Sequence, residues 1–122
     1  MSSCDVFTVH TPLSPATHHL IGRDQLAQMK PGSYLVNTAR GAVCDEAAIV
    51  EALESGVLAG AALDCFEDEP RIHPGLRKAE NNVILAPHIG ATVEEVAREM
   101  CLEEIANLDA FLSTGTPLNV CN

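Results

Sequence analysis

Three side chains of this chain could together handle a small carboxylic acid: Arg40, Glu69 and His88. An arginine can bind a carboxylate through two parallel hydrogen bonds. A histidine exchanges protons near neutral pH, and a neighbouring carboxylate favours its protonated form. The set suits proton transfer on a 2-oxo or 2-hydroxy acid, with a hydride carrier needed for the rest of the reaction.

Each of these residues also has an ordinary structural explanation. Arginines often form structural ion pairs, a histidine that follows a strand is often structural, and acidic runs are usually solvated. The functional interpretation therefore depends on whether the fold brings the three side chains together.

Four short apolar segments predict β-strands, and segments with helical spacing alternate with them. The predicted strands are residues 5–10, 34–36, 58–63 and 83–86, and the predicted helices are residues 23–30, 45–55 and a last helix that runs from a capping box at residues 92–95 to Gly115. This alternation is typical of an α/β fold with a parallel sheet. The bulky 34–36 segment is expected to be buried on both faces.

Polar residues lie at the carboxyl end of each predicted strand or just beyond it. His10 is the last residue of the first strand, Arg40 comes after the second, Asp64 after the third and His88 after the fourth, while Glu69 lies in the acidic loop after Asp64. Because the carboxyl ends of parallel strands meet at one edge of a sheet, we expect these side chains to converge on one crevice.

Composition limits the classes of partner. The 122 residues carry a net charge of -10, which argues against nucleic acid and anionic membranes as partners. No apolar run approaches the length of a membrane-spanning helix, and the first residues lack the features of a signal peptide, so a cytoplasmic protein is expected. The five cysteines include no Cys-x-x-Cys pair, and no metal site is expected.

Several separated motifs resemble one family. They are, in chain order, Cys4–Leu13, Met29–Gly32, Leu35–Gly41, Ala52–Gly56, Leu63–Pro70 and Ala86–Gly90. In these segments the chain resembles the second half of the nucleotide-binding domain of the D-isomer-specific 2-hydroxyacid dehydrogenases. That family includes D-3-phosphoglycerate dehydrogenases and glyoxylate/hydroxypyruvate reductases.

The resemblance implies a Rossmann-like parallel sheet of about four strands, with helices on both faces, and a role for each matching residue. Arg40 matches the substrate-binding arginine, His88 the catalytic acid/base, and Glu69 the glutamate that pairs with the histidine. Asp64 matches a residue near the nicotinamide. The implied cofactor-binding set is His10, Thr11, Pro12, Thr38, Ala39, Arg40, Asp64, His88, Gly90 and Ala91. The implied cofactor is NAD, with NADP left open, and the implied substrate is a small 2-oxo or 2-hydroxy acid.

The sequence departs from the family in extent. None of its glycines forms the Gly-x-Gly-x-x-Gly turn that receives the pyrophosphate, and the separate substrate domain is missing. Residues 1–122 are therefore expected to be a partial NAD(P)-binding domain, a fragment of a dehydrogenase.

Two other interpretations stay open. The C-terminal-binding-protein corepressors share the Arg, Glu and His set, and residues 18–21 resemble theirs. Such a protein would use the dinucleotide to control assembly, and it should show little turnover of 2-oxo acids. An inactive remnant that keeps the fold but binds no ligand is the third possibility.

The predicted strand at residues 5–10 generates a first testable expectation. Without the missing half of the domain, this strand would form an open edge of the sheet, which favours pairing with a second chain. We expect the isolated chain to self-associate, as a homodimer by resemblance, or to be only marginally stable. Sedimentation that detected a well-folded monomer at low concentration would contradict this expectation.

Overall fold

A computed structural model describes residues 1–78, 80 and 82–120. The chain divides into an α/β unit, Met1–Ile89, and a second unit, Gly90–Asn122. The predicted site residues from His10 to His88 all lie in the α/β unit, whereas Gly90 and Ala91 belong to the second unit.

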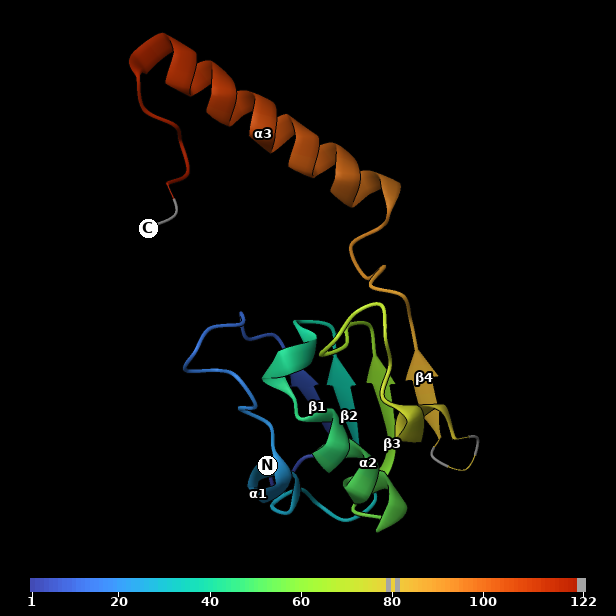
Figure 1. Ribbon diagram of the computed structural model, residues 1–122. Helices are drawn as coiled ribbons and strands as arrows, with labels where there is room; N and C mark the ends of the chain where they lie inside the picture. The colour runs from blue at the N-terminus through green and yellow to red at the C-terminus, as the bar shows by residue number, and fades with distance from the viewer. Residues whose placement is uncertain (79, 81, 121–122) are drawn as a thin grey trace. The chain divides into compact units, whose positions relative to one another are not determined.

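The α/β unit is built on a four-stranded parallel sheet, as the sequence predicts (Figure 1). Its strands, in spatial order, are β1 (Val6–Val9), β2 (Ser33–Asn37), β3 (Leu58–Leu63) and β4 (Val83–Leu85). Strand β1 is an edge strand, as expected, and self-association through it stays a prediction.

The register of the sheet places the ends of all four strands at the same level. Val9 pairs with Asn37, Asn37 with Leu63, and Leu63 with Leu85. The residues that directly follow these four therefore begin at one edge of the sheet, which confirms the predicted convergence of the strand ends.

The helices of this unit are shorter than the sequence predicts. Helix α2 (Glu46–Glu54) begins as expected at Asp45, whose side chain accepts a hydrogen bond from the backbone N–H of Ala48 at 3.1 Å. Helix α1 ends earlier than predicted and covers only Arg23–Leu26. The chain then tightens, because the N–H groups of Gln28 and Met29 bond to carbonyls three residues back rather than four.

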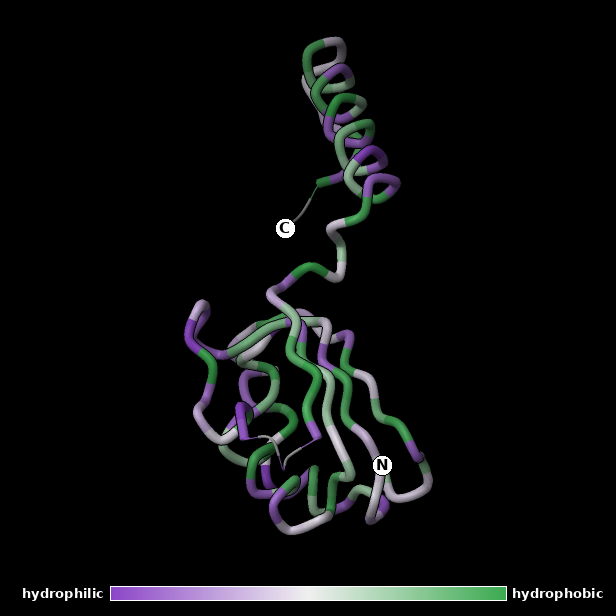
Figure 2. Tube along the Cα trace, turned by 90° about the vertical axis from the view of Figure 1, so that its right-hand side faces the viewer, coloured by the Kyte–Doolittle hydropathy of each residue, from purple (hydrophilic) through white to green (hydrophobic). Residues whose placement is uncertain are grey.

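One continuous hydrophobic core lies between the sheet and the helices. Leu35 of β2, Ile49 of α2 and Leu58 of β3 are almost completely buried in it. Figure 2 shows the helical segments of this unit on one side of the strands. On the opposite face Tyr34 is 45% exposed and Ile84 is 72% exposed.

The expectation that residues 34–36 are buried on both faces is therefore wrong. Side chains alternate between the faces of a strand, and in this unit α1 and α2 pack with the sheet in a single core, on one of its faces. The segment is typical of a fully buried strand in sequence because all three of its side chains are bulky.

The second unit contains helix α3 (Glu94–Thr114), along which polar and apolar residues alternate (Figure 2). The helix ends at Gly115 in a left-handed conformation, with φ 78°, as the sequence predicts. The predicted capping box at residues 92–95 is wrong, because the helix begins after Val93, which places Thr92 one residue too early to cap it. No helix in the described part of the chain is both long and apolar enough to cross a membrane.

Removal of an aliphatic side chain should lower the free energy of unfolding by different amounts on the two faces of the sheet. Leu35→Ala should lower the free energy of unfolding by about 2–5 kcal/mol, because it leaves a cavity under the helices. Ile84→Ala, on the exposed face, should cost less than about 1 kcal/mol. Urea unfolding of both variants checks this, and equal losses would contradict the one-sided core.

Candidate active site

Arg40 is positioned by a buried side chain at the end of β2. Asn37 is 1% exposed, and its amide oxygen accepts a hydrogen bond from the N–H of Ala39 at 3.0 Å. Its amide nitrogen donates to the carbonyl of Arg40 at 3.1 Å. Asn37 thereby fixes the turn that carries Arg40, and this turn continues into a single 3₁₀ turn at Gly41–Val43.

The guanidinium of Arg40 is exposed to solvent. Its Nη1 donates a hydrogen bond to the carbonyl of Ala39 at 2.6 Å. Within the part of the chain that the structure describes, Arg40 forms no ion pair. A carboxylate ligand could therefore approach this cation without displacing a protein carboxylate.

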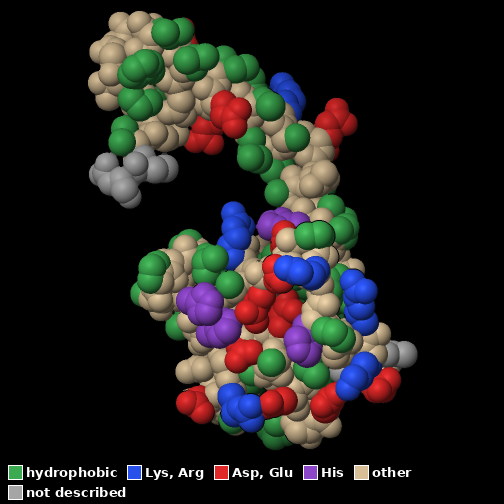
Figure 3. All heavy atoms as spheres, viewed as in Figure 1, with side chains coloured by type: hydrophobic (Ala, Val, Ile, Leu, Met, Phe, Trp, Pro, Cys, Tyr) green, Lys and Arg blue, Asp and Glu red, His purple; other side chains and the backbone are tan. Residues whose placement is uncertain are grey.

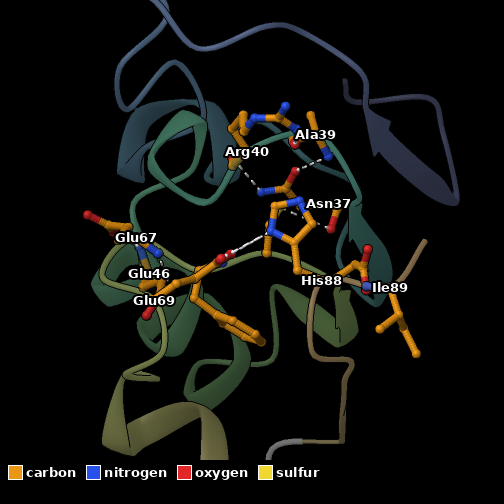
Figure 4. A network of polar contacts seen from close by, with 11 residues as sticks. Asn37, Ala39, Arg40, Glu46, Glu67, Glu69, His88 and Ile89 are labelled. Atoms are coloured by element: carbon orange, nitrogen blue, oxygen red, sulfur yellow. Dashed lines mark hydrogen bonds and ion pairs between the residues drawn. The ribbon is translucent and has the colours of Figure 1, made fainter. Parts of the chain in front are cut away.

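His88 and Glu69 form the central pair of the site (Figure 4). Nδ1 of His88 lies 3.0 Å from one carboxylate oxygen of Glu69 and 3.1 Å from the other. An ionised carboxylate only accepts hydrogen bonds, so Nδ1 carries the proton and Nε2 is left as the nitrogen that can exchange a proton with a ligand.

Glu69 is held as an anion by its surroundings. The backbone N–H of Phe66 donates to Glu69 at 2.9 Å, and this bond is the main reason that the pKa of Glu69 lies below its usual value. The hydrogen bond from His88 lowers the pKa further, and the positive charges of His88 and Arg40 add smaller effects. Glu69 is thus within electrostatic reach of both His88 and Arg40.

The backbone of His88 is strained. Its φ of 56° lies in the left-handed region, which residues other than glycine rarely adopt. The next residue is anchored, because the N–H of Ile89 donates to the buried carboxylate of Asp64 at 2.9 Å. Asp64 thus fixes the chain beside His88, and its predicted place near the nicotinamide stays a prediction. Strain of this kind is concentrated at functional sites.

Gly41 allows the turn of Arg40 to touch the loop of Glu69. A Cβ at Gly41 would overlap the backbone of Phe66 and lie 2.5 Å from the backbone nitrogen of Glu67. Only glycine therefore permits this approach of two backbones.

Two hollows border these residues. One, of about 430 Å³, is lined by the loops after β1 and β2: His10, Thr11, Pro12, Leu13, Thr38, Ala39 and Arg40. The other, of about 170 Å³, contains Glu69 and His88 in its lining. The structure thus groups the predicted cofactor residues of the first two strand ends, while the cofactor roles of Gly90 and Ala91 stay predictions.

A larger hollow of about 610 Å³ is lined by none of the predicted catalytic residues. It is lined by acidic and basic side chains that include Glu46, Glu67 and Arg77. Figure 3 shows acidic side chains gathered at the centre of the α/β unit, with histidines around them. The paired titratable groups Glu69 and His88 lie at the strand edge, and this edge, not the larger hollow, is therefore the candidate active site.

Sequence reasoning missed three residues that hold the site together. Asn37 was detectable in principle, since a polar residue inside an apolar strand must find hydrogen-bond partners. Glu46 and Glu67 gave no signal, because carboxylates in the first turn of a helix and in an acidic loop are common.

The Glu69–His88 contact predicts how acid affects the fold. Because the folded-state pKa of Glu69 is lowered, its ionised form stabilises the folded chain above the unfolded-state pKa, and this contribution is lost as pH falls through the folded-state pKa. His88→Ala should raise the pKa of Glu69 towards its usual value and shrink this acid-linked loss of stability.

Carbon-13 NMR titration of the Glu69 carboxyl would measure the change. His10→Ala is the matched control, because His10 bonds to the hydroxyl of Thr8 at 2.8 Å. An unchanged Glu69 titration in His88→Ala would rule out the contact.

Known proteins resemble this chain in sequence. The sequence profile of the D-isomer specific 2-hydroxyacid dehydrogenase NAD binding domain matches residues 1–90. The chain is 46% identical over 123 residues to a glyoxylate reductase of Thermococcus litoralis, which covers 100% of this chain and 37% of that protein. It is 50% identical over 103 residues to the D-3-phosphoglycerate dehydrogenase of Pan troglodytes, which covers 84% of this chain and 19% of that protein.

Solved structures show the same similarity. A glyoxylate reductase from Paecilomyes thermophila superposes with a TM-score of 0.89 at 44% identity, over 94% of this chain and 35% of that one. An NADPH-dependent glyoxylate/hydroxypyruvate reductase from Sinorhizobium meliloti, in complex with NADP and malonate, gives 0.88 at 36% identity, over 97% of this chain and 37% of that one. The chain thus spans little more than a third of these enzymes. It belongs to the D-isomer specific 2-hydroxyacid dehydrogenase family, whose NAD binding domain is matched by residues 1–90.

Proposed function

We propose that this chain carries the catalytic residues of an NAD(P)-dependent oxidoreductase that transfers a hydride between the nicotinamide and a small 2-oxo or 2-hydroxy acid. The observation that supports this proposal most strongly is the His88–Glu69 pair, with both carboxylate oxygens within 3.1 Å of Nδ1. The pair lies at the carboxyl ends of parallel strands, where such folds bind their ligands.

The loops after β1 and β2 would hold the dinucleotide, which supplies the hydride when it is bound. Thr11, Thr38 and Ala39 line a hollow of about 430 Å³ at this edge, and its polar and small side chains suit a ribose and a nicotinamide. No pyrophosphate-binding glycine turn occurs in the sequence, so these residues account for only part of a cofactor site.

Arg40 would bind the carboxylate of the substrate. Its guanidinium is exposed beside this hollow and is bonded only to a backbone carbonyl among the described residues. A planar guanidinium binds a carboxylate through two parallel hydrogen bonds, which fixes the orientation of the acid as well as its position.

His88 would move the proton. In the reduction of a 2-oxo acid it would protonate the oxygen of the carbonyl group as the hydride reaches the carbon, and in the reverse direction it would accept the proton of the hydroxyl. Glu69 would stabilise the charged imidazole and fix the ring with Nδ1 protonated.

Cofactor binding is the first test. The chain contains no tryptophan, so the fluorescence of added NADH can be followed against a low background. We expect a saturable signal that Arg23→Ala leaves unchanged, because Arg23 pairs with Glu51 at 2.7 Å, outside the residues that line this hollow. A signal that grows only in proportion to added NADH would contradict cofactor binding by this chain alone.

Turnover is the second test, and it uses a complete enzyme. Residues 1–122 would replace the aligned segment of the Thermococcus litoralis glyoxylate reductase. In this chimaera His88→Ala should lower kcat with glyoxylate by about 10²–10⁴-fold. Arg40→Ala should lower kcat/KM by about 10–100-fold, the value of a charge-assisted pair.

The control variants are His18→Ala and Arg23→Ala, which alter exposed residues outside the site. Full activity in His88→Ala would exclude the proposed acid/base. An active parent enzyme with an inactive but folded chimaera would favour a remnant, and cofactor binding without turnover would favour a dinucleotide-regulated binding protein.

A further inference from the structure

Glu46 is an unusual residue for the first turn of a helix, because its carboxylate is buried. The residue is 7% exposed. One carboxylate oxygen accepts the N–H of Glu67 at 2.8 Å, and the other accepts the N–H of His73 at 3.1 Å. Both oxygens are therefore engaged by the backbone of the loop that contains Glu69.

Glu67 in turn contacts the backbone of Glu46 and the side chain of His19. Its Oε1 accepts the N–H of Glu46 at 2.7 Å, which satisfies one of the free donors at the start of α2. Its Oε2 lies 2.9 Å from Nε2 of His19. Two carboxylates that would repel each other in isolation are thus held by backbone donors, the helix terminus and a histidine.

These bonds hold the loop on both sides of Glu69. The loop is attached at Glu67 and again at His73, and Glu69 lies between these points. Gly41 also packs against the backbone of Phe66 and Glu67. The side chain of Glu69 then turns back to the N–H of Phe66 and to His88 (Figure 4).

We propose that Glu46 is a positioning residue for the His88–Glu69 pair: by holding the loop at Glu67 and His73 it sets the direction in which Glu69 faces His88. The inference deepens the proposed function, on which it rests for the role of the pair. It assigns to α2, which supplies none of the residues predicted for the site, the task of orienting the partner of the acid/base.

Glu46→Gln tests the proposal in the complete 122-residue chain. The side chains are similar in size, but the amide has only one acceptor oxygen, so one of the two backbone N–H groups loses its partner. We expect hydrogen exchange at Glu67 or His73 to accelerate at least about tenfold. The pKa of the Glu69 carboxyl, measured by carbon-13 NMR, should rise because the contacts of Glu69 with Phe66 and His88 loosen.

The direction of this change separates positioning from simple electrostatics. Removing the negative charge of Glu46 would by itself lower the pKa of Glu69, because a like charge is lost. A rise therefore requires a change in geometry. Glu46→Asp keeps the charge and shortens the reach, so it should also raise the pKa, and it serves as the second variant if the glutamine variant does not fold.

The matched control is Glu51→Gln, the same substitution on the same helix. Glu51 is half exposed and pairs with Arg23, away from the loop. It should leave both the exchange rates and the Glu69 titration unchanged.

Accelerated exchange with an unchanged or lowered Glu69 pKa in both Glu46 variants would overturn the proposal and leave Glu46 with a purely structural role. These measurements need no dinucleotide. Failure of NADH binding would therefore count against the proposed function without affecting this result. A negative result with the Glu46 variants would likewise leave the proposed function unaffected.

Discussion

The site depends on the contact between two backbones, that of Gly41 and that of Phe66 and Glu67. No side chain fits at Gly41, so the turn after β2 and the loop after β3 meet directly. The turn carries Arg40 and the loop carries Glu69. A contact without an intervening side chain has little freedom to adjust, which fixes the separation of the two backbone segments that carry Arg40 and Glu69.

Around this contact the structure uses side chains to satisfy backbone groups that the sheet leaves unpaired. Asn37 bonds to the turn after β2, Asp64 to the N–H of Ile89, and Glu46 to the loop after β3. A parallel sheet ends its hydrogen-bond ladder at its carboxyl edge, and polar groups there need other partners. The left-handed backbone of His88 persists because its neighbour is anchored in this way.

The sequence allows the framework of the site to be predicted, because strand ends can be read from apolar runs. Arg40 and His88 directly or closely follow two such runs, and the parallel arrangement brings them to one edge. The residue types suggest Glu69 as a partner for His88 and the family resemblance implies the same pairing, but the loop geometry that brings them together depends on contacts from elsewhere in the chain. The contacts of Glu46 could not be recognised, because they are made with residues more than twenty positions away.

Local errors have equally specific causes. Thr92 has the right residue type for a helix cap, but α3 begins one residue too late for its side chain to serve. The segment 34–36 consists of bulky residues, yet only the face towards α1 and α2 is buried. Residue type limits the environments in which a side chain is stable, and the neighbouring residues determine which of these environments it has in the fold.

The exposed guanidinium of Arg40 has a consequence for the kinetics of ligand capture. The chain has a net charge of -10, so an approaching anion is repelled over roughly a Debye length, about 8 Å at physiological ionic strength. At contact the same anion would meet the guanidinium of Arg40, which forms no ion pair with any residue that the structure describes, and would be attracted. Added salt weakens both effects, which makes the association rate rise while the bound complex loses affinity. On the proposed role of Arg40, speed of capture and strength of binding would thus be set by different charges, the first by the whole chain and the second by one residue.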